Sequence, residues 1–201
     1  MLETMMAISL GIGLAAACGF RVFVPTLVIG IAVRADLLTL ADGFEWMGSW
    51  VAIAAFGTAT LFEISAYYLP WLDNLLDTVS TPIAIVAGVI VSAAFIQDMH
   101  PAMKWSLAVI AGGGAAGTIS GGLAGIRLAS TLTTGGIANP IVSTIEWIFA
   151  IVMSLLAIFL PIIAAVVAFA LVAFFIRSAY RFAVRNSNPV SKKTPVESWE
   201  S

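Results

Sequence analysis

The sequence predicts an all-α integral membrane protein. Of its 201 residues, 61% are hydrophobic and only 10% are charged, and the mean hydropathy is +1.05. A soluble domain carries about 25% charged residues, so this chain lacks the polar surface that a water-facing fold requires. The apolar runs have room for about five transmembrane helices, some of them broken or re-entrant. Residues 1–185 are expected to form a single transmembrane domain, and the polar end, 186–201, a disordered cytoplasmic tail.

The first three apolar runs predict helices of unequal length. The run at 5–33 contains Arg21 and Pro25, and its length allows a helix that is tilted, kinked or broken. A second span is expected at 50–69, because tryptophan and tyrosine side chains near its ends resemble an aromatic belt. A third and shorter span is expected at 82–96.

The fourth expected span, 105–127, is crowded with glycine. Seven glycines lie within it: Gly112, Gly113, Gly114, Gly117, Gly121, Gly122 and Gly125. Small residues let helices approach closely in lipid, so this Gly-rich helix is also a candidate surface for homo-oligomer formation. The last span is expected at 147–176, with Pro161 near its middle as a kink.

The distribution of basic residues predicts the orientation. Five of the nine lysines and arginines follow the last span: Arg177, Arg181, Arg185, Lys192 and Lys193. By the positive-inside rule, the C-terminus is expected to be cytoplasmic. The start, Met1–Met6, lacks the positive region of a signal peptide, so the first run is expected to remain as a span. With a net charge of −2 and no basic stripe elsewhere, no nucleic-acid partner is expected.

Two arginines lie in apolar surroundings, and each ends a Gly-x-Arg motif that follows an Ala/Gly-rich stretch. The motifs are Gly19-Phe20-Arg21 and Gly125-Ile126-Arg127. An arginine in the bilayer costs about 3 kcal/mol on insertion scales, so two of them indicate an internal polar centre. The repeated motif also suggests an internal repeat, whose broken helices would meet near the midplane if the two halves are inverted.

The segment 71–81 is predicted to be a two-turn amphipathic helix that precedes the third span. Its polar face carries Asp73, Asn74 and Asp77, and the two carboxylates are neighbours because they are four residues apart. Either the helix lies in the membrane interface with its acids in water, or it folds back into the protein so that an acid meets one of the two arginines.

Two further acids are candidate partners for the arginines. Glu63 lies inside the second span, where it forms either a structural salt bridge or a proton or ion site. Glu146 directly precedes the last expected span, and an acid in a first helical turn is favoured by the helix dipole. A structural role at the helix start is therefore the favoured interpretation for Glu146.

Residues 127–143 are predicted to form a polar break between two apolar helices. A Gly-Gly pair is expected to end one helix, and an Asn-Pro pair to begin the next. Thr133, Thr134 and Asn139 become candidate solute or ion ligands if this break lies at membrane depth, where irregular backbone must be buried in protein or line a wet cavity. An ordinary loop outside the membrane is the alternative.

No motif indicates an enzyme. The glycines after Gly112 lack the Gly-Lys-Ser/Thr of a phosphate loop, and neither a nucleophile elbow nor an HExxH motif is present. The single cysteine, Cys18, excludes an intramolecular disulfide, and the single histidine, His100, has no partners for a transition-metal site. No cofactor is expected. A lipid-directed enzyme with a divalent metal on Asp73 and Asp77 is the weakest hypothesis, because two carboxylates are an incomplete site.

Several motifs occur in a specific order: Gly-Leu-Ala-Ala-Ala-Cys-Gly-Phe-Arg-Val-Phe-Val-Pro (13–25), Gly-Ser-Trp (48–50), Leu-Asp-Asn-Leu-Leu-Asp-Thr (72–78), Thr-Pro (81–82), Ala-Gly-Gly-Gly-Ala-Ala-Gly-Thr (111–118) and Arg-Leu-Ala-Ser-Thr-Leu-Thr-Thr-Gly-Gly-Ile-Ala-Asn-Pro (127–140). This order resembles a bacterial family of small polytopic membrane proteins, domain of unknown function 4126. The resemblance covers nearly all of residues 8–176. It implies a bacterial inner-membrane protein, and it brings no activity and no site residues.

Two functions remain open. The first is a transporter or channel for a small solute or ion, in which the two arginines slightly favour an anion; if acids neutralise both, a cation or a proton-coupled substrate is as well supported. The second is a non-transport scaffold that binds lipid or protein through the Gly-rich helix, with the charges as internal ion pairs. A wet cavity that reaches the arginines would favour transport, whereas a dry and fully paired interior would favour the scaffold.

Overall fold

The computed structural model describes residues 2–66, 70–97, 99–135 and 137–186, and within these ranges the side chains of 66 and 70–78 and of 185–186 lie outside the description. The described residues form helices and connecting turns, without a strand among them. The helices are α1 (Leu2–Phe20), α2 (Phe23–Arg34), α3 (Trp50–Ala66), α4 (Pro70–Phe95), α5 (Pro101–Leu107), α6 (Gly114–Thr134), α7 (Asn139–Phe159) and α8 (Pro161–Asn186), with a 3₁₀ turn η1 (Glu45–Gly48) and a π-helical segment η2 (Ala108–Gly113). The predicted all-α membrane architecture is confirmed.

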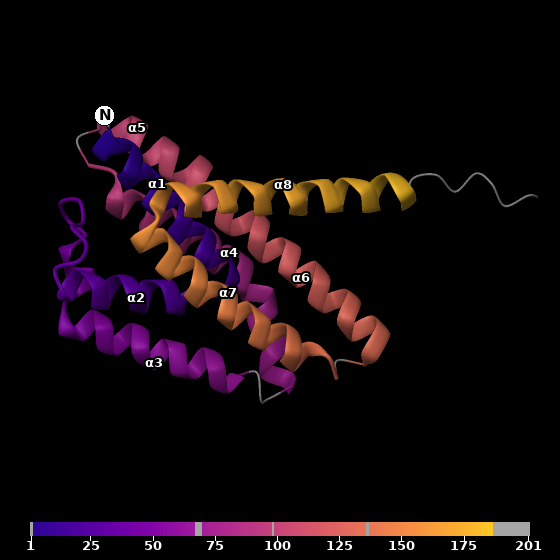
Figure 1. Cartoon of the computed structure of the whole chain (residues 1–201). Coiled ribbons are helices and arrows are strands. Elements are labelled where there is room, and N and C mark those ends of the chain that lie inside the picture. The colour runs from indigo at the N-terminus through magenta and orange to yellow at the C-terminus, as the bar shows by residue number, and fades with distance from the viewer. Residues whose placement is uncertain (1, 67–69, 98, 136, 187–201) are drawn as a thin grey trace, which may run out of the picture.

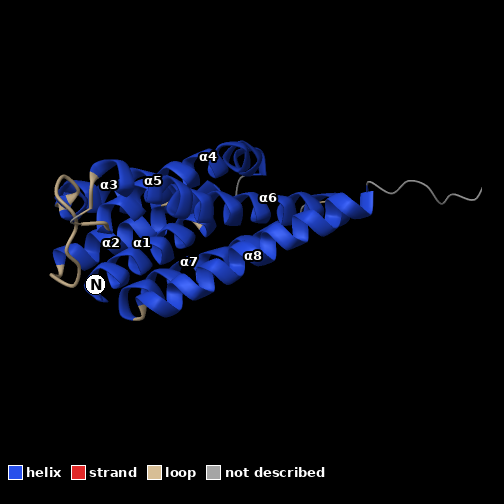
Figure 2. Cartoon of the chain, turned by 90° about the horizontal axis from the view of Figure 1, so that it is seen from above, coloured by secondary structure: helices blue, strands red, loops and turns tan. Residues whose placement is uncertain are grey.

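Helix α1 forms the centre of the bundle. Helices α4, α6, α7 and α8 pack around it, and every residue from Gly11 to Phe20 is buried. Helices α2 and α3 lie side by side at the lower left of Figure 1, and α8 extends to the right beyond the other helices. In the view from above, α8 runs along one side of the bundle, next to α7 (Figure 2).

Among the described residues, four helices are long and apolar enough to cross a membrane by length and composition. They are α1, the continuous helical stretch Pro101–Thr134, α7, and the part of α8 from Pro161 to Val184. Three shorter apolar stretches accompany them among the described side chains: Phe23–Arg34, Trp50–Ser65 and, within α4, Val79–Phe95. The run expected at 5–33 is the long helix α1 followed by the short helix α2, and the run expected as one kinked helix at 147–176 belongs to two long helices, α7 and α8.

Two prolines explain where the long apolar runs are divided. Pro25 has no backbone N–H and its ring clashes with the carbonyl four residues earlier, which belongs to Arg21. Accordingly α1 ends at Phe20, and α2 begins at Phe23, so the first run is broken. Pro161 disfavours helical geometry at Leu160, whose φ of −137° and ψ of 64° separate α7 from α8.

Two local predictions are wrong. Helix α4 is continuous with Pro82 inside it, so 71–81 is not a separate two-turn helix. Helix α6 continues through Arg127 as far as Thr134, so the expected polar break shrinks to the turn between α6 and α7. In that turn Gly135 takes the left-handed conformation (φ 64°), as expected for a glycine that ends a helix.

Glycine allows a close contact between α4 and η2. A Cβ on Gly112 would overlap Ser92 and would lie 2.6 Å from the carbonyl oxygen of Gly88. Gly114, two residues later, has no atom within 4 Å of the place where its Cβ would lie. The glycines of this region therefore divide into those that the bundle requires and those on an open face.

We expect Gly112→Ala to lower the free energy of unfolding by about 1–3 kcal/mol, because the added methyl group overpacks a contact formed by backbone atoms. Gly114→Ala is the matched control, and it should leave stability unchanged or slightly raised, since alanine favours a helix. Unfolding by SDS in mixed micelles, followed by circular dichroism, measures both. Equal stability of the two variants would contradict the tight contact between α4 and η2.

Candidate functional site

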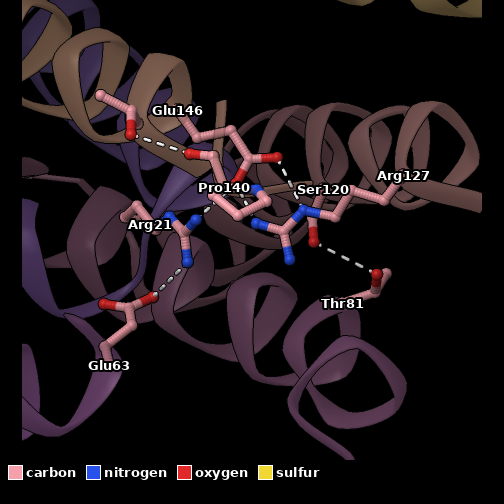
Figure 3. Close-up of polar contacts among 8 residues, drawn as sticks. Arg21, Glu63, Thr81, Ser120, Arg127, Pro140 and Glu146 are labelled. Carbon is pink, nitrogen blue, oxygen red and sulfur yellow. Dashed lines mark hydrogen bonds and ion pairs between the residues drawn. The ribbon is translucent and has the colours of Figure 1, made fainter. Parts of the chain in front are cut away.

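A cluster of charged side chains lies at the break between α1 and α2. Arg21 comes from the break itself, Glu63 from α3, Arg127 from α6 and Glu146 from α7 (Figure 3). Relative exposure is only 2% for Arg21, 6% for Arg127 and 2% for Glu146. Charges are buried at acceptable cost only when they are paired. We call these four residues the polar centre.

Glu146 binds both arginines. The Arg127 Nε donates to Glu146 Oε1 over 2.9 Å, and the Arg127 Nη2 donates to Oε2, so the pair is bidentate. The Arg21 Nη2 lies 2.7 Å from the same Oε2. Bidentate arginine–carboxylate pairs are among the strongest hydrogen-bonded contacts in proteins. One carboxylate thus ties the helix break to α6 and α7.

Glu63 is held less tightly than Glu146. Its Oε1 lies 3.9 Å from Arg21 Nη1, which is beyond hydrogen-bond distance, and its side chain is 13% exposed. Its Oε2 is buried and forms no hydrogen bond with the described residues. The backbone N–H groups of Val22 and Phe23, at the start of α2, lie next to this carboxylate. Such N–H groups have no acceptor within their helix and favour a negative charge.

A small cavity of about 30 Å³ adjoins the polar centre. All four charged residues line it, together with residues that include Cys18, Ser80 and Ser120. The Ser120 hydroxyl lies 3.1 Å from the Thr81 hydroxyl and links α6 to α4 (Figure 3). This volume has room for about one or two water molecules. The cavity brings guanidinium and hydroxyl groups together, which are suitable donors for a small anion.

Three of the residues singled out in the sequence, Arg21, Arg127 and Glu63, lie together in the polar centre. Glu146 joins them, although its sequence position favoured a role at a helix start. Helix α7 begins at Asn139, so Glu146 lies about two turns inside the helix and not in its first turn. The Asn-Pro pair at this helix start was the signal that could have placed Glu146 correctly.

The other candidates from α6 and α7 lie apart from the polar centre. Thr133 and Thr134 are exposed, and each hydroxyl donates to a backbone carbonyl four residues earlier, over 2.8 Å in both cases. The Asn139 Nδ2 donates to the Thr131 hydroxyl over 3.1 Å. None of the three lines the cavity. The remaining candidates, the side chains of Asp73, Asn74 and Asp77, lie outside the described residues.

The two Gly-x-Arg motifs reach the same carboxylate from different backbone settings. Arg21 follows the last residue of α1, whereas Arg127 lies inside α6, seven residues before its end. The two arginines therefore contact the same carboxylate from different local backbone structures. The two motifs do not form a pair of equivalent broken helices.

A family model described as domain of unknown function (DUF4126) matches residues 8–181. The chain belongs to the DUF4126 family. This confirms the resemblance that the motif order indicated, and the polar centre of this DUF4126 protein lies entirely within the matched segment. No curated protein and no solved structure matches the chain. The family description carries no activity, so a function has to be argued from the polar centre.

We expect Glu146→Gln to lower the free energy of unfolding by about 3–5 kcal/mol, because it removes the negative charge that two buried guanidinium groups share. Glu63→Gln is the matched control. It should cost clearly less, since Glu63 is partly exposed and its ion pair is longer. SDS unfolding in mixed micelles measures both variants, and an equal or larger loss for Glu63→Gln would show that Glu146 is not the principal partner.

Proposed function

We propose that this protein carries a small anion across a bacterial inner membrane and that the polar centre is its binding site. The observation that supports this role is the meeting of two buried guanidinium groups with the N-terminus of a broken helix, at the end of the apolar helix α1. In secondary transporters, interrupted helices commonly point their N-termini at anionic groups of the substrate. Charged residues inside membrane segments also commonly mark solute or ion pathways.

Because the charges of the polar centre balance, its net charge favours neither sign, and the way in which the two carboxylates are held is what favours an anion over a cation. The two arginines are matched by two carboxylates, and Glu146 is fully engaged by Arg21 and Arg127. A cation would have to compete with guanidinium groups for these carboxylates. An anion needs to replace only Glu63, whose Oε1 is 3.9 Å from Arg21 Nη1 and whose other neighbours, the backbone N–H groups of Val22 and Phe23, can equally serve an anion.

The geometry limits the size of the substrate. The cavity beside the arginines measures about 30 Å³, and apolar residues such as Phe20 and Leu123 form part of its wall. A planar guanidinium presents parallel donors that suit oxyanions. Small inorganic anions and short carboxylates are therefore the substrate classes that this cavity accommodates with the least rearrangement.

A scaffold without transport is the second candidate. It is supported by the complete pairing of Glu146 and by the small volume of the cavity, since a closed ion-pair network could serve only to fix the register of α1, α6 and α7. In that role, a second copy or lipid would bind the open face of α6. On this face Gly114, Gly121 and Gly125 have no atom within 4 Å of the places where their Cβ atoms would lie.

The proposed orientation places the C-terminus in the cytoplasm. Basic residues gather near the end of α8, with Arg177 and Arg181 exposed there, and positive charge is enriched on the cytoplasmic side of membrane proteins. Binding and passage of the anion need no cofactor and no catalytic chemistry.

Flux into proteoliposomes tests the proposal. Chloride, nitrate, phosphate and lactate are compared with sodium and potassium, and we expect at least one of the anions to enter faster than into protein-free vesicles. Arg127→Gln should reduce this flux by about tenfold or more, because it removes a bidentate charged donor from the site. Arg177→Gln is the matched control, since Arg177 is exposed on α8, and its flux should equal that of the native protein.

Three outcomes would contradict anion transport. Equal anion flux in the Arg127→Gln and native proteins would show that the transported anion does not pass through the polar centre. Flux of a cation alone would overturn the choice of an anion. No flux of any solute, from protein that remains monodisperse and helical, would favour the scaffold.

A further inference from the structure

We infer that Glu63 is an exchangeable internal anion: it leaves Arg21 when it takes up a proton, so that a proton and a monovalent substrate anion occupy the polar centre together. This inference rests on the proposed transport of an anion and names the coupling ion. It makes the protein a proton–anion symporter with one proton for each anion.

The two carboxylates of the polar centre differ in a way that separates their roles. Glu146 is 2% exposed and makes close contacts with two guanidinium groups, so its carboxylate is held in place from two sides. Glu63 is 13% exposed, lies 3.9 Å from Arg21 and beside the backbone N–H groups of Val22 and Phe23, and has a buried Oε2 without a side-chain hydrogen bond to the described residues. Of the two, Glu63 is the group that a proton can reach and neutralise at the lower cost.

The groups around Glu63 show which charges would remain if its side chain moved away from Arg21. Among the described side chains, Arg21 at the break is its cationic neighbour, Glu146 on α7 is the acid near it, and Cys18 on α1 is the nearby thiol. Arg127 on α6 and Ser80 on α4 line the same cavity. A neutral Glu63 would therefore leave an excess positive charge beside the first N–H groups of α2, which is an anion site.

The charges balance at each step. In the resting state, two guanidinium groups face two carboxylates. Proton uptake converts the Glu63 carboxylate to a carboxylic acid and gives the polar centre a net charge of +1. A monovalent anion then binds Arg21 and the N-terminus of α2, and the net charge returns to zero. Release of the anion and of the proton on the other side restores the Glu63–Arg21 pair, so the cycle moves no net charge.

The test uses two measurements on the same proteoliposomes. Net symport is measured with trapped pyranine, because an inward gradient of chloride or nitrate should carry protons in and acidify the lumen. Anion exchange is measured as entry of the labelled anion against the same unlabelled anion inside, with no pH gradient. We expect the native protein to perform both, and net symport to continue unchanged when valinomycin and potassium clamp the membrane potential at zero.

The decisive variant is Glu63→Gln, which carries a permanently neutral side chain. We expect it to lose proton entry by about tenfold or more while anion exchange remains above that of protein-free vesicles. Glu63→Asp keeps a titratable carboxylate and should retain proton entry, which guards against a simple folding defect in the glutamine variant. Glu3→Gln, an exposed position in the first turn of α1, is the matched control and should behave as the native protein does.

The outcomes separate the inference from the transport proposal. Anion flux without proton entry in the native protein, proton entry that persists in Glu63→Gln, or loss of exchange together with proton entry in that variant would each overturn the coupling role and leave anion transport in place. No flux of any solute by the native protein would overturn both.

Discussion

The contact of one carboxylate, that of Glu146, with two arginines is the interaction on which the arrangement of the helices depends. Removing a guanidinium group from water costs several kcal/mol unless a partner compensates it. The polar end of α1 can therefore lie inside the bundle only where α7 supplies Glu146, and Arg127 draws α6 to the same point. Small residues make this approach sterically possible: a Cβ on Gly19 would lie 2.8 Å from the carbonyl oxygen of Ala116.

The break between α1 and α2 adds the N-terminus of a helix to the ion-pair network. A continuous helix at this position would satisfy its own backbone, and would present only the side chain of Arg21. Because Pro25 interrupts it, the N–H groups at the start of α2 add partial positive charge beside the guanidinium. The carboxylate of Glu63 lies against both groups, and its long contact with Arg21 makes it the member of the polar centre that can be replaced.

Composition predicted the membrane class, and the length of the first apolar run, with Pro25 in it, allowed a tilted, kinked or broken helix, of which the structure has the break. The apolar surroundings of the two arginines indicated an internal polar centre, because these are local properties of the sequence. The sequence offered Glu146 as one of several candidate partners of the arginines but could not select it, since Glu146 meets both of them only when α7 crosses the bundle beside them. Helix α4 tolerates Pro82 because packing of a membrane bundle can compensate for a lost backbone bond. The sequence at the hydroxyl-rich end of α6 resembled a binding turn. In the structure, the hydroxyls of Thr133 and Thr134 instead donate hydrogen bonds to backbone carbonyls of α6 itself.

The central claim is that small anions reach the polar centre, and thiol labelling of its cavity tests this most directly. Ser120→Cys places a thiol on the cavity wall, in a Cys18→Ala background that removes the native cysteine. In intact proteoliposomes, the account predicts that a negatively charged methanethiosulfonate modifies this thiol faster than a positively charged one, and that the transported anion slows the reaction. A thiol that prefers the positive reagent, or whose reaction the transported anion does not slow, would contradict an anion site at the helix break.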